Sequence, residues 1–461
     1  MNLSLEQLLD QEYLPQRLAQ RGMKDTAASD KAALFAGAAQ YLLDRGATRT
    51  QQAQAFFVPG RIEVLGKHTD YVGGRSIVSA MEQGFCWVAL PIAESVLRVG
   101  AVESGEEVEF AFASQLDPRH GHWSNYPMTV ARRLARNFST RMQGARMAFA
   151  SDLPLAAGMS SSSAMMIATY LPLAAINNLE QNETFSNHIN DKLSLAAYLG
   201  TIENGQSFGA LSGDKGVGTF GGSEDHTAIL CSEAGSLGQF AYCPARFERH
   251  ISMPQGYSFA IAFSGIVAEK TGAAQEQYNR AVSLVATIVA AWQQATGKSH
   301  IYLADILASA PQAAQHLHQI LGQNAIGGFT GGELQMRLQH FIAENEEIVG
   351  PAGNALAALD LPAFGKLVDR SQELTHTLLG NQVPQTIALA RLARSCGAVA
   401  ASAFGAGFGG SVWALIKTTA ATPFLKAWSG AYAEAFPPAS AQARFFLTGA
   451  GPAAFDLGEE V

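Results

Sequence analysis

The chain has 461 residues, more than one ordinary hydrophobic core requires, so its length predicts two domains or one large one. Apolar residues make up 48% of it and charged residues 15%, a composition that buries well and excludes a disordered chain. The formal net charge of −8 argues against a nucleic-acid partner, because proteins that bind a phosphate backbone usually present a basic face.

The cysteines and the N-terminus give no sign of export or of a bound metal cluster. The four cysteines stand far apart and form no C-x-x-C pair, which argues against zinc, an iron–sulfur cluster or a disulfide framework. The first 22 residues mix acids and bases at helical spacing and lack the apolar run of a secretory signal. No window has the apolar length of a membrane span. We therefore expect a cytoplasmic protein without a membrane partner.

The first half of the chain alternates helical and extended patterns. Residues 1–54 predict two amphipathic helices, the first with Leu3, Leu5, Leu8 and Leu9 on one face and the second over residues 33–43. Strands are predicted at 56–65, interrupted by Pro59-Gly60, and at 77–92, followed by a hairpin over 96–112. Helical patterns then cover 122–138, 164–176 and 193–203, with a short strand at 146–150 between the first two.

The second half begins with a stretch rich in glycine and serine at 205–222. Strand character returns at 251–263, helical patterns dominate 273–357, and strands at 399–403 and 411–416 flank a glycine-rich turn. This mixture lacks regular strand–helix alternation and therefore favours an α+β fold over a doubly wound parallel sheet. Pro244 and Pro254 punctuate a domain boundary between about residues 243 and 255.

Residues 152–170, DLPLAAGMSSSSAMMIATY, join a strand-like lead-in to an apolar helix through a turn of small residues. The backbone N–H groups of such a turn, together with the helix dipole, suit a polyphosphate. The serine hydroxyls can donate to phosphate oxygens or ligate Mg²⁺. No lysine follows the glycine, so this is not a Walker A loop. Serines that only cap a buried helix would give the same pattern.

Two further segments combine glycine with polar or small residues. Residues 402–416, SAFGAGFGGSVWALI, allow another backbone or a ligand to approach closely, although a tight hairpin would explain the same glycines. Residues 59–74, PGRIEVLGKHTDYVGG, place Arg61 at a turn and a run of polar side chains at the end of an apolar strand. Such a density of donors and acceptors suits a hydroxylated ligand.

These three segments, in this order, resemble the signature motifs of the GHMP kinase superfamily, and residues 59–74 resemble the galactokinase signature P-G-R-x-N-x-I-G-E-H-T-D-Y-x-x-G. Other galactokinase-like pieces are WSNY at 123–126, YNR at 278–280 and the helix pattern of Arg337, His340, Glu344 and Asn345. The resemblance covers roughly residues 55–416. It implies two lobes, a ribosomal-protein-S5-like α/β lobe over 1–245 and a ferredoxin-like lobe over 246–461.

The resemblance also implies an ATP-dependent sugar-1-kinase that uses Mg²⁺ and phosphorylates the anomeric hydroxyl of galactose or a related aldose. Asp225 stands where the family has the Asp of a C-G-x-M-D-Q segment, and would accept the hydroxyl proton. Arg61 matches the family arginine that keeps this Asp ionised and offsets developing charge. Glu224 is the alternative base, although its side chain would point the other way if this piece were extended.

The same resemblance assigns the remaining site residues. The sugar would be bound by Lys67, His68, Asp70, Gly222 and Tyr278. The ATP phosphates would be bound by Gly158, Ser160, Ser161 and Ser162, and the adenine by Trp123 and Tyr126, whose aromatic faces can stack on a base. Ser162 and Glu203 would ligate the metal.

The sequence departs from the galactokinase pattern at four places. Lys67 replaces a Glu that contacts the sugar near its C6 hydroxyl, Glu63 replaces Asn, Ala156 replaces the first glycine of the phosphate motif, and residues 205–218 lengthen the spacing from Glu203 to Asp225. The ammonium of Lys67 raises the alternative of an anionic sugar such as a uronic acid. Arabinose, a heptose and a non-catalytic sugar sensor remain further alternatives, and the oligomeric state is not defined.

Overall fold

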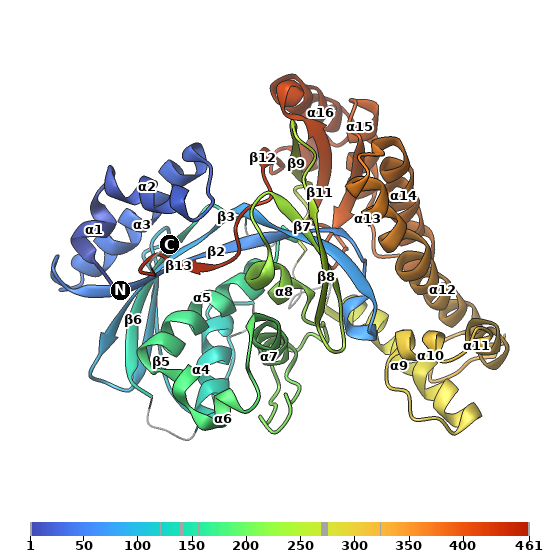
Figure 1. Ribbon diagram of the computed structural model, residues 1–461, viewed down its shortest axis with the longest axis horizontal. Helices are drawn as coiled ribbons and strands as arrows, with labels where there is room; N and C mark the ends of the chain where they lie inside the picture. The colour runs from blue at the N-terminus through green and yellow to red at the C-terminus, as the bar shows by residue number, and fades with distance from the viewer. Residues whose placement is uncertain are drawn as a thin grey trace.

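The computed structural model describes residues 2–119, 121–138, 142–154, 157–268, 275–322 and 324–459. Within these residues the chain forms a nine-stranded sheet and a four-stranded sheet, with helices packed on both (Figure 1). This arrangement confirms the predicted α+β class. Ala156 and the first two residues of the predicted helical region 273–357 lie outside the described residues. None of the helices described combines the length and apolarity of a membrane span.

Two long antiparallel strands, β2 (Gln52–Leu65) and β3 (Arg75–Ile92), form the centre of the larger sheet. Strand β6 (Gly144–Ser151) pairs with β3 and lies parallel to β4 (Val96–Ala101), which forms the predicted hairpin with β5 (Glu107–Ala111). The β2–β3 register shifts between Pro59 and Arg61, where the sequence predicted an interruption. Proline cannot donate to the ladder, so an irregularity is expected there. Arg61 directly follows this irregularity in β2.

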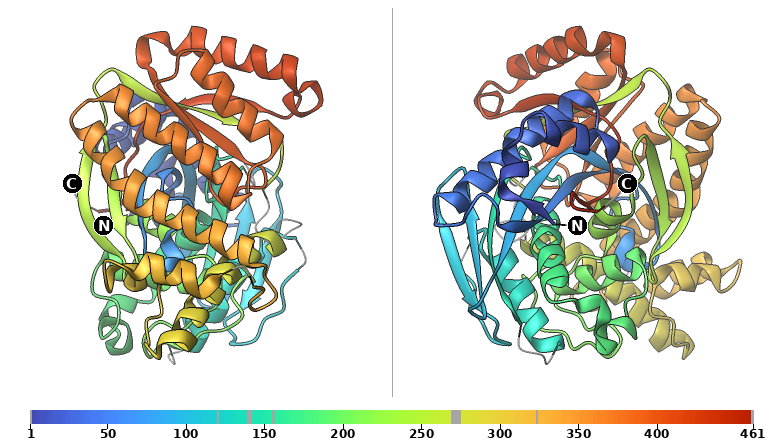
Figure 2. Two further views of the ribbon diagram at one scale, coloured as in Figure 1. Left: turned by 90° about the vertical axis from the view of Figure 1, so that its right-hand side faces the viewer. Right: turned by 60° about the vertical axis from the view of Figure 1, so that its left-hand side comes forward.

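Successive side chains of β2 and β3 point to opposite faces of the sheet and enter two separate cores. Val58, Ile62 and Trp87 belong to the core beneath the helices α4 (Asn125–Asn137), α5 (Ser161–Ile176), α7 (Lys192–Asn204) and α8 (Glu224–Cys231). Phe57 and Val88 belong to the core beneath the N-terminal helices. Figure 2 shows the blue N-terminal helices on the side of the sheet opposite the green ones. The short helix α6 (Glu183–Ser186) lies between α5 and α7 in the chain.

The N-terminal region forms three helices, so the prediction of two was wrong. They follow the two-residue strand β1 (Leu3–Ser4) and span α1 (Leu5–Leu9), α2 (Tyr13–Gln20) and α3 (Asp25–Leu43). Asp10 ends α1 and accepts hydrogen bonds from the backbone N–H groups of Glu12 and Tyr13, which starts a new helix. Gly22, at φ +88°, separates α2 from α3.

The smaller sheet is antiparallel throughout, in the order β10 (Ala400–Phe404), β11 (Ser411–Lys417), β9 (Tyr257–Phe263) and β12 (Arg444–Thr448). The helices that lie near this sheet form one part of the second lobe, and a separate group of helices, the helical arm, forms the other (Figure 1). The arm comprises α9 (Gln275–Thr296), α10 (Leu303–Ala308), α11 (Ala313–Leu321) and α12 (Gly331–Ile342). The helices near the sheet are α13 (Gly350–Ala357), α14 (Leu361–Leu374), α15 (Pro384–Ser395), α16 (Ala421–Ala435) and α17 (Pro437–Ser440).

The strand pairing places the change of sheet slightly later than the predicted lobe boundary at residue 245. Strands β7 (Ser236–Ala241) and β8 (Arg246–Ser252) form a hairpin that pairs with β3 in the larger sheet. The smaller sheet begins with β9 at Tyr257. We therefore propose a boundary between β8 and β9. The C-terminal strand β13 (Phe455–Asp456) returns to the larger sheet and pairs with β2.

Candidate active site

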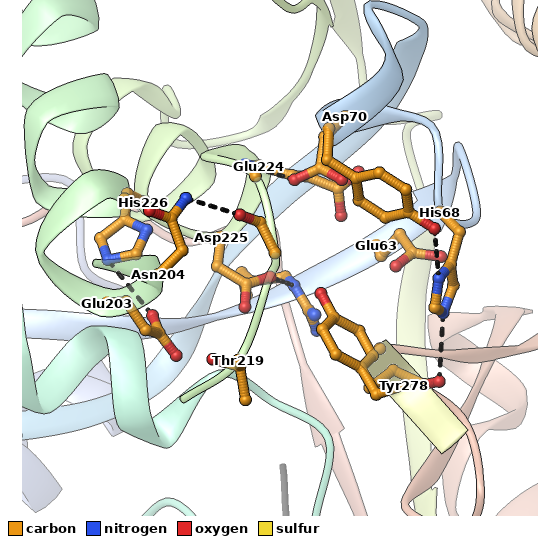
Figure 3. Close-up of a pocket in the computed structure, with 17 residues that line it drawn as sticks. Glu63, His68, Asp70, Glu203, Asn204, Thr219, Glu224, Asp225, His226 and Tyr278 are labelled. Carbon is orange, nitrogen blue, oxygen red and sulfur yellow. Dashed lines mark hydrogen bonds and ion pairs between the residues drawn. The ribbon is translucent and has the colours of Figure 1, made fainter. Parts of the chain in front are cut away.

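A cavity lies where β2, α7 and α8 meet α9 and the turn between β10 and β11 (Figure 3). Seven of the residues assigned from the sequence line it together: Arg61, His68, Asp70, Glu203, Gly222, Asp225 and Tyr278. They come from segments more than 200 residues apart in the chain. The fold thus assembles the predicted acid–base, sugar-binding and metal-binding side chains in one place.

Arg61 and Asp225 form a direct ion pair in the cavity. The Nε atom of Arg61 donates to Oδ1 of Asp225 at 2.7 Å, and its NH1 group donates to the Gly158 carbonyl at 2.7 Å. Only 2% of Arg61 is exposed. Burial by itself would lower the pKa of Arg61, but the carboxylates of Asp225, Glu63 and Glu224 raise it above its usual value. The guanidinium therefore stays charged and connects Asp225 with the phosphate turn.

Asp225 is the second residue of α8, and Glu224 is the first. Because this segment is helical rather than extended, neighbouring side chains are separated by only about 100° around the axis. Glu224 lines the cavity alongside Asp225, which corrects the expectation that it would point away. Little in the sequence indicates this helix start, since Ser223 precedes it without a capping hydrogen bond from its side chain.

The predicted phosphate turn leads into α5, whose first residue is Ser161. Ser160 adopts φ +57° and is buried, and its hydroxyl has no hydrogen-bond partner among the described residues. Ser162 Oγ donates to Glu203 Oε1 at 3.3 Å, and Ser163 Oγ donates to Glu203 Oε2 at 2.7 Å. An unpartnered hydroxyl at a helix N-terminus suits an anion. Hydroxyl and carboxylate oxygens suit Mg²⁺, so these residues fit both assigned ligands.

The glycine-rich turn between β10 and β11 packs on the phosphate turn. Gly405 has φ +83°, and a Cβ atom there would lie 2.8 Å from the carbonyl oxygen of Gly158. Ser411 Oγ donates to the Ala157 carbonyl at 2.7 Å. The segment therefore forms a hairpin turn, and its backbone packs closely on the backbone of the phosphate turn. It thus connects the second lobe to the first.

His68 and Tyr278 form the wall of the cavity nearest the helical arm (Figure 3). His68 Nδ1 lies 2.9 Å from the Tyr71 hydroxyl, and its Nε2 lies 3.2 Å from the Ala406 carbonyl. The Tyr278 ring contacts the His68 ring with a centroid separation of 5.3 Å. Asn381, which also contacts His68 Nε2 at 3.4 Å, has no sequence pattern around it that could have identified it.

The Arg337–Asn345 motif contacts the backbone of residues 66–68, which the sequence assigned to sugar binding, and the sequence alone did not define this role. Arg337 NH2 donates to the His68 carbonyl at 2.7 Å. Glu344 Oε1 accepts from the backbone N–H groups of Gly66 at 2.8 Å and Lys67 at 3.3 Å. These buried contacts fix the backbone of residues 66–68, of which His68 lines the cavity.

Lys67 is buried and paired with Glu63 and is not among the residues that line the cavity. Only 1% of it is exposed, and its Nζ lies 3.3 Å from Glu63 Oε1. Glu63 lines the cavity, whereas Lys67 does not. The two departures from the galactokinase signature thus form a single buried ion pair, in which the acidic partner faces the ligand site.

Changing Lys67 to methionine is expected to lower the free energy of unfolding by about 3–5 kcal/mol, because the change leaves the Glu63 carboxylate buried and unpaired. The double variant Glu63→Gln/Lys67→Met should recover most of this loss. Denaturant unfolding measures the free energy of unfolding of both variants. Lys24→Met is the matched control, since Lys24 is 62% exposed and its ion pair with Glu82 should be worth about 1 kcal/mol or less. A Lys67→Met protein as stable as the wild type would contradict the pairing.

Trp123 and Tyr126 lie at the start of α4 and are not among the cavity-lining residues. Trp123 Nε1 donates to Glu106 Oε2 at 2.9 Å, and its ring meets Phe149 edge-on with a centroid separation of 5.4 Å. Both rings pack against the core of the first lobe. Their assignment to an adenine pocket stays a prediction.

The extra residues 205–218 are anchored to α4 by a buried ion pair. Asp214 Oδ2 accepts from Arg132 Nε at 2.7 Å, and Arg132 NH2 donates to the Gly216 carbonyl at 2.9 Å. The segment then leads to Thr219, which lines the cavity. The insertion is therefore a fixed part of the first lobe beside the site.

Comparisons with known protein families agree with this geometry. Residues 47–91 match the galactokinase galactose-binding signature, residues 125–214 match the GHMP kinases N terminal domain, and residues 354–434 match the GHMP kinases C terminal family. The chain is 26% identical over 406 residues to a galactokinase of Roseiflexus sp. (strain RS-1), covering 86% of this chain and 93% of that protein. It is 27% identical over 419 residues to a galactokinase of Exiguobacterium sibiricum, with coverages of 88% and 94%.

Solved structures show the same fold. Lactococcus lactis galactokinase complexed with galactose superposes with a TM-score of 0.70 at 21% identity, covering 87% of this chain and 95% of that one. L. major mevalonate kinase in complex with R-mevalonate gives a TM-score of 0.52 at 14% identity, with coverages of 87% and 96%. The order of the matched domains, the two-lobed fold and the assembled cavity together place this chain in the GHMP kinase superfamily, where it resembles the galactokinases.

Proposed function

We propose that this protein is a sugar-1-kinase that transfers the γ-phosphoryl group of ATP to the anomeric hydroxyl of an aldose. The observation that carries the proposal is the Arg61–Asp225 ion pair, which lies between the phosphate turn and the sugar-binding wall. Galactose is the reference acceptor, because the matched signature and the curated relatives are those of galactokinases.

Phosphoryl transfer depends mainly on positioning and on neutralising charge. Asp225 would accept the proton of the acceptor hydroxyl as its oxygen attacks phosphorus. The guanidinium of Arg61, 2.7 Å from Asp225, favours the ionised carboxylate and offsets charge that develops on the transferred group. The backbone N–H groups at the start of α5, with Ser160 and Ser161, would hold the phosphates.

The metal and adenine assignments extend this proposal. Ser162 and Glu203 would hold Mg²⁺, which when bound neutralises negative charge on the phosphate oxygens. Trp123 and Tyr126 would border the adenine. A cytoplasmic location stays a prediction.

The charges around the cavity favour a neutral acceptor over a uronic acid. The carboxylates that line it are Glu63, Asp70, Glu203, Glu224 and Asp225. Among the described lining residues, Arg61 is the one lysine or arginine, and it already pairs with Asp225. Lys67, which had suggested an anionic sugar, pairs with Glu63. A carboxylate on the acceptor would therefore approach a cavity wall whose described charged side chains are mostly carboxylates.

A coupled ADP-release assay over galactose, galacturonate, arabinose and a heptose tests the proposal. We expect turnover of at least one neutral aldose, with kcat/KM for galacturonate at least about 10-fold below that for galactose. A higher kcat/KM for galacturonate would refute the argument from charge. No turnover of any sugar, despite measurable ATP binding, would show the non-catalytic sugar sensor instead.

A further inference from the structure

The hydroxyl group of Ser163 contacts two carboxylates to which the proposed mechanism gives different tasks. Ser163 is the third residue of α5 and is fully buried. Its Oγ donates to Glu203 Oε2 at 2.7 Å and lies 3.4 Å from Asp225 Oδ2. Figure 3 shows both carboxylates on the side of the cavity away from His68. Ser163 is not among the residues that line this cavity, so we expect it to act through these two neighbours.

Each of the two carboxylates contacts another functional side chain through its other oxygen. Asp225 Oδ1 accepts from Arg61 Nε at 2.7 Å. Glu203 Oε1 accepts from Ser162 Oγ at 3.3 Å. Ser163 therefore lies between the pair assigned to proton transfer and the pair assigned to the metal. A side chain in this place influences how the two pairs are oriented toward each other.

A hydroxyl group suits a place between two carboxylates because it has a hydrogen to donate, whereas ionised carboxylates only accept. The shorter distance is to Glu203, which therefore receives the stronger hydrogen bond. Rotation about the Cβ–Oγ bond turns the hydrogen toward Asp225 without moving either carboxylate. Active-site hydrogen bonds are often long until the reacting complex forms, so the 3.4 Å contact is within reach of a shorter one.

Resting on the proposed function, we propose that Ser163 is a positioning residue that couples the base Asp225 to the metal ligand Glu203. Asp225 is then contacted on both of its oxygens, by Arg61 on Oδ1 and by Ser163 on Oδ2, which fixes the plane of the carboxylate. Glu203 is likewise contacted on both oxygens, by Ser162 and by Ser163. One hydroxyl thus sets the orientation of the base relative to the metal site.

The variant Ser163→Ala removes this hydroxyl and adds no bulk. Glu203 keeps its contact with Ser162, and its Oε2 still lies 3.4 Å from His226 Nε2, so we expect the variant to fold. At saturating Mg²⁺ and ATP, kcat should fall by about 10-fold or more, the effect of a hydrogen bond to a charged group. The KM for the sugar should change by less than about 3-fold. Wild-type kcat in this variant would overturn the proposal.

Thr169→Val is the matched control for the loss of a buried hydroxyl from the same helix. Thr169 is fully buried, and its Oγ1 donates to the Met165 carbonyl of α5. Valine keeps the shape of the side chain. We expect wild-type kcat and wild-type Mg²⁺ affinity in this variant. A loss of kcat as large as in Ser163→Ala would overturn the proposal, because any buried hydroxyl of α5 would then have the same effect.

Binding of Mg²⁺ provides a measurement that does not depend on turnover. Calorimetry with a non-hydrolysable ATP analogue should show that the Kd for Mg²⁺ rises by about 10-fold in Ser163→Ala, as expected when a side chain that orients a metal ligand is lost. A loss of kcat without a loss of Mg²⁺ affinity would overturn the coupling, and so would the reverse. In either case Ser163 would serve one carboxylate only.

A double variant separates positioning from a structural role. In an Asp225→Asn background, Ser163→Ala should lower kcat by less than about 3-fold, because a positioning residue has little effect once the group that it positions is gone. A structural role would give the same loss in both backgrounds. An undiminished loss of about 10-fold in the Asp225→Asn background would therefore overturn the proposal.

Unfolding temperatures test the same contacts even if the protein phosphorylates no sugar. The shifts caused by Ser163→Ala and Asp225→Asn should be non-additive, and so should those of Ser163→Ala and Glu203→Gln, because residues in one hydrogen-bond network are coupled. Additive shifts in either pair would overturn the coupling. Non-additive shifts in both pairs, together with no turnover of any sugar, would refute the kinase and still support the coupling.

Discussion

Replacing Asp225 by asparagine is expected to lower kcat by about 10²- to 10⁴-fold, the range that general base catalysis supplies. The amide keeps the size of the side chain and can still accept a hydrogen bond from Arg61, 2.7 Å away. It cannot take the proton of the attacking hydroxyl. The change should therefore affect kcat more strongly than the KM for the sugar, as expected for an interaction that matters chiefly in the transition state.

Steady-state ADP release at saturating ATP measures this effect. Circular dichroism and thermal unfolding establish that the variant is folded. Asp117→Asn is the matched control, because the Asp117 side chain is fully exposed and its 3.7 Å ion pair with Lys215 lies at the surface. An Asp225→Asn enzyme that keeps more than about a tenth of wild-type kcat would contradict the assignment of this residue as the base.

Arg61 is expected to affect kcat nearly as strongly as Asp225, for a different reason. Arg61→Lys keeps the charge, but an ammonium lacks the planar fork that lets one guanidinium reach both Asp225 and the Gly158 carbonyl. We expect kcat to fall by about 10²- to 10³-fold, comparable to the loss of one preorganised donor in a transition state. Arg61→Met should also reduce the free energy of unfolding by about 3–5 kcal/mol, because it removes a largely buried ion pair with Asp225.

The two Arg61 variants separate catalysis from stability. Kinetics and denaturant unfolding should show a loss of kcat without a large loss of stability in Arg61→Lys, and a loss of both in Arg61→Met. Arg98→Lys is the control, because Arg98 pairs with Glu109 on a hairpin remote from the cavity. Wild-type kcat in Arg61→Lys would mean that charge alone is needed at this position.

Part of the site follows from local sequence patterns. The Pro59-Gly60 interruption, the start of α5 after a run of small residues and the glycine-rich β10–β11 turn lie where the sequence predicted them. Each depends on backbone preferences of the residues themselves: proline lacks an N–H group, and glycine tolerates positive φ. The helix start at Glu224 and the extra N-terminal helix were not predicted, because the first lacks a capping side chain and the second depends on a short Asp10 turn.

The orientation and pairing of charged side chains required the tertiary structure. From the sequence, Lys67 indicated a cation for the sugar; in the folded chain it pairs with Glu63, and the acidic partner faces the cavity. Arg61 and Asp225 are 164 positions apart, and Glu344 reaches Gly66 across 278. Such contacts depend on how distant elements pack, which no local periodicity encodes.

The sequence by itself therefore determined the family, the order of the motifs and the residue types that phosphoryl transfer requires. Only the tertiary structure decided which charges neutralise each other and which remain exposed to a ligand. The physical reason is that the effect of a charge depends on its burial and its nearest partner. In residues 59–74, Lys67 is buried and paired with Glu63, and of these two side chains it is Glu63 that lines the cavity.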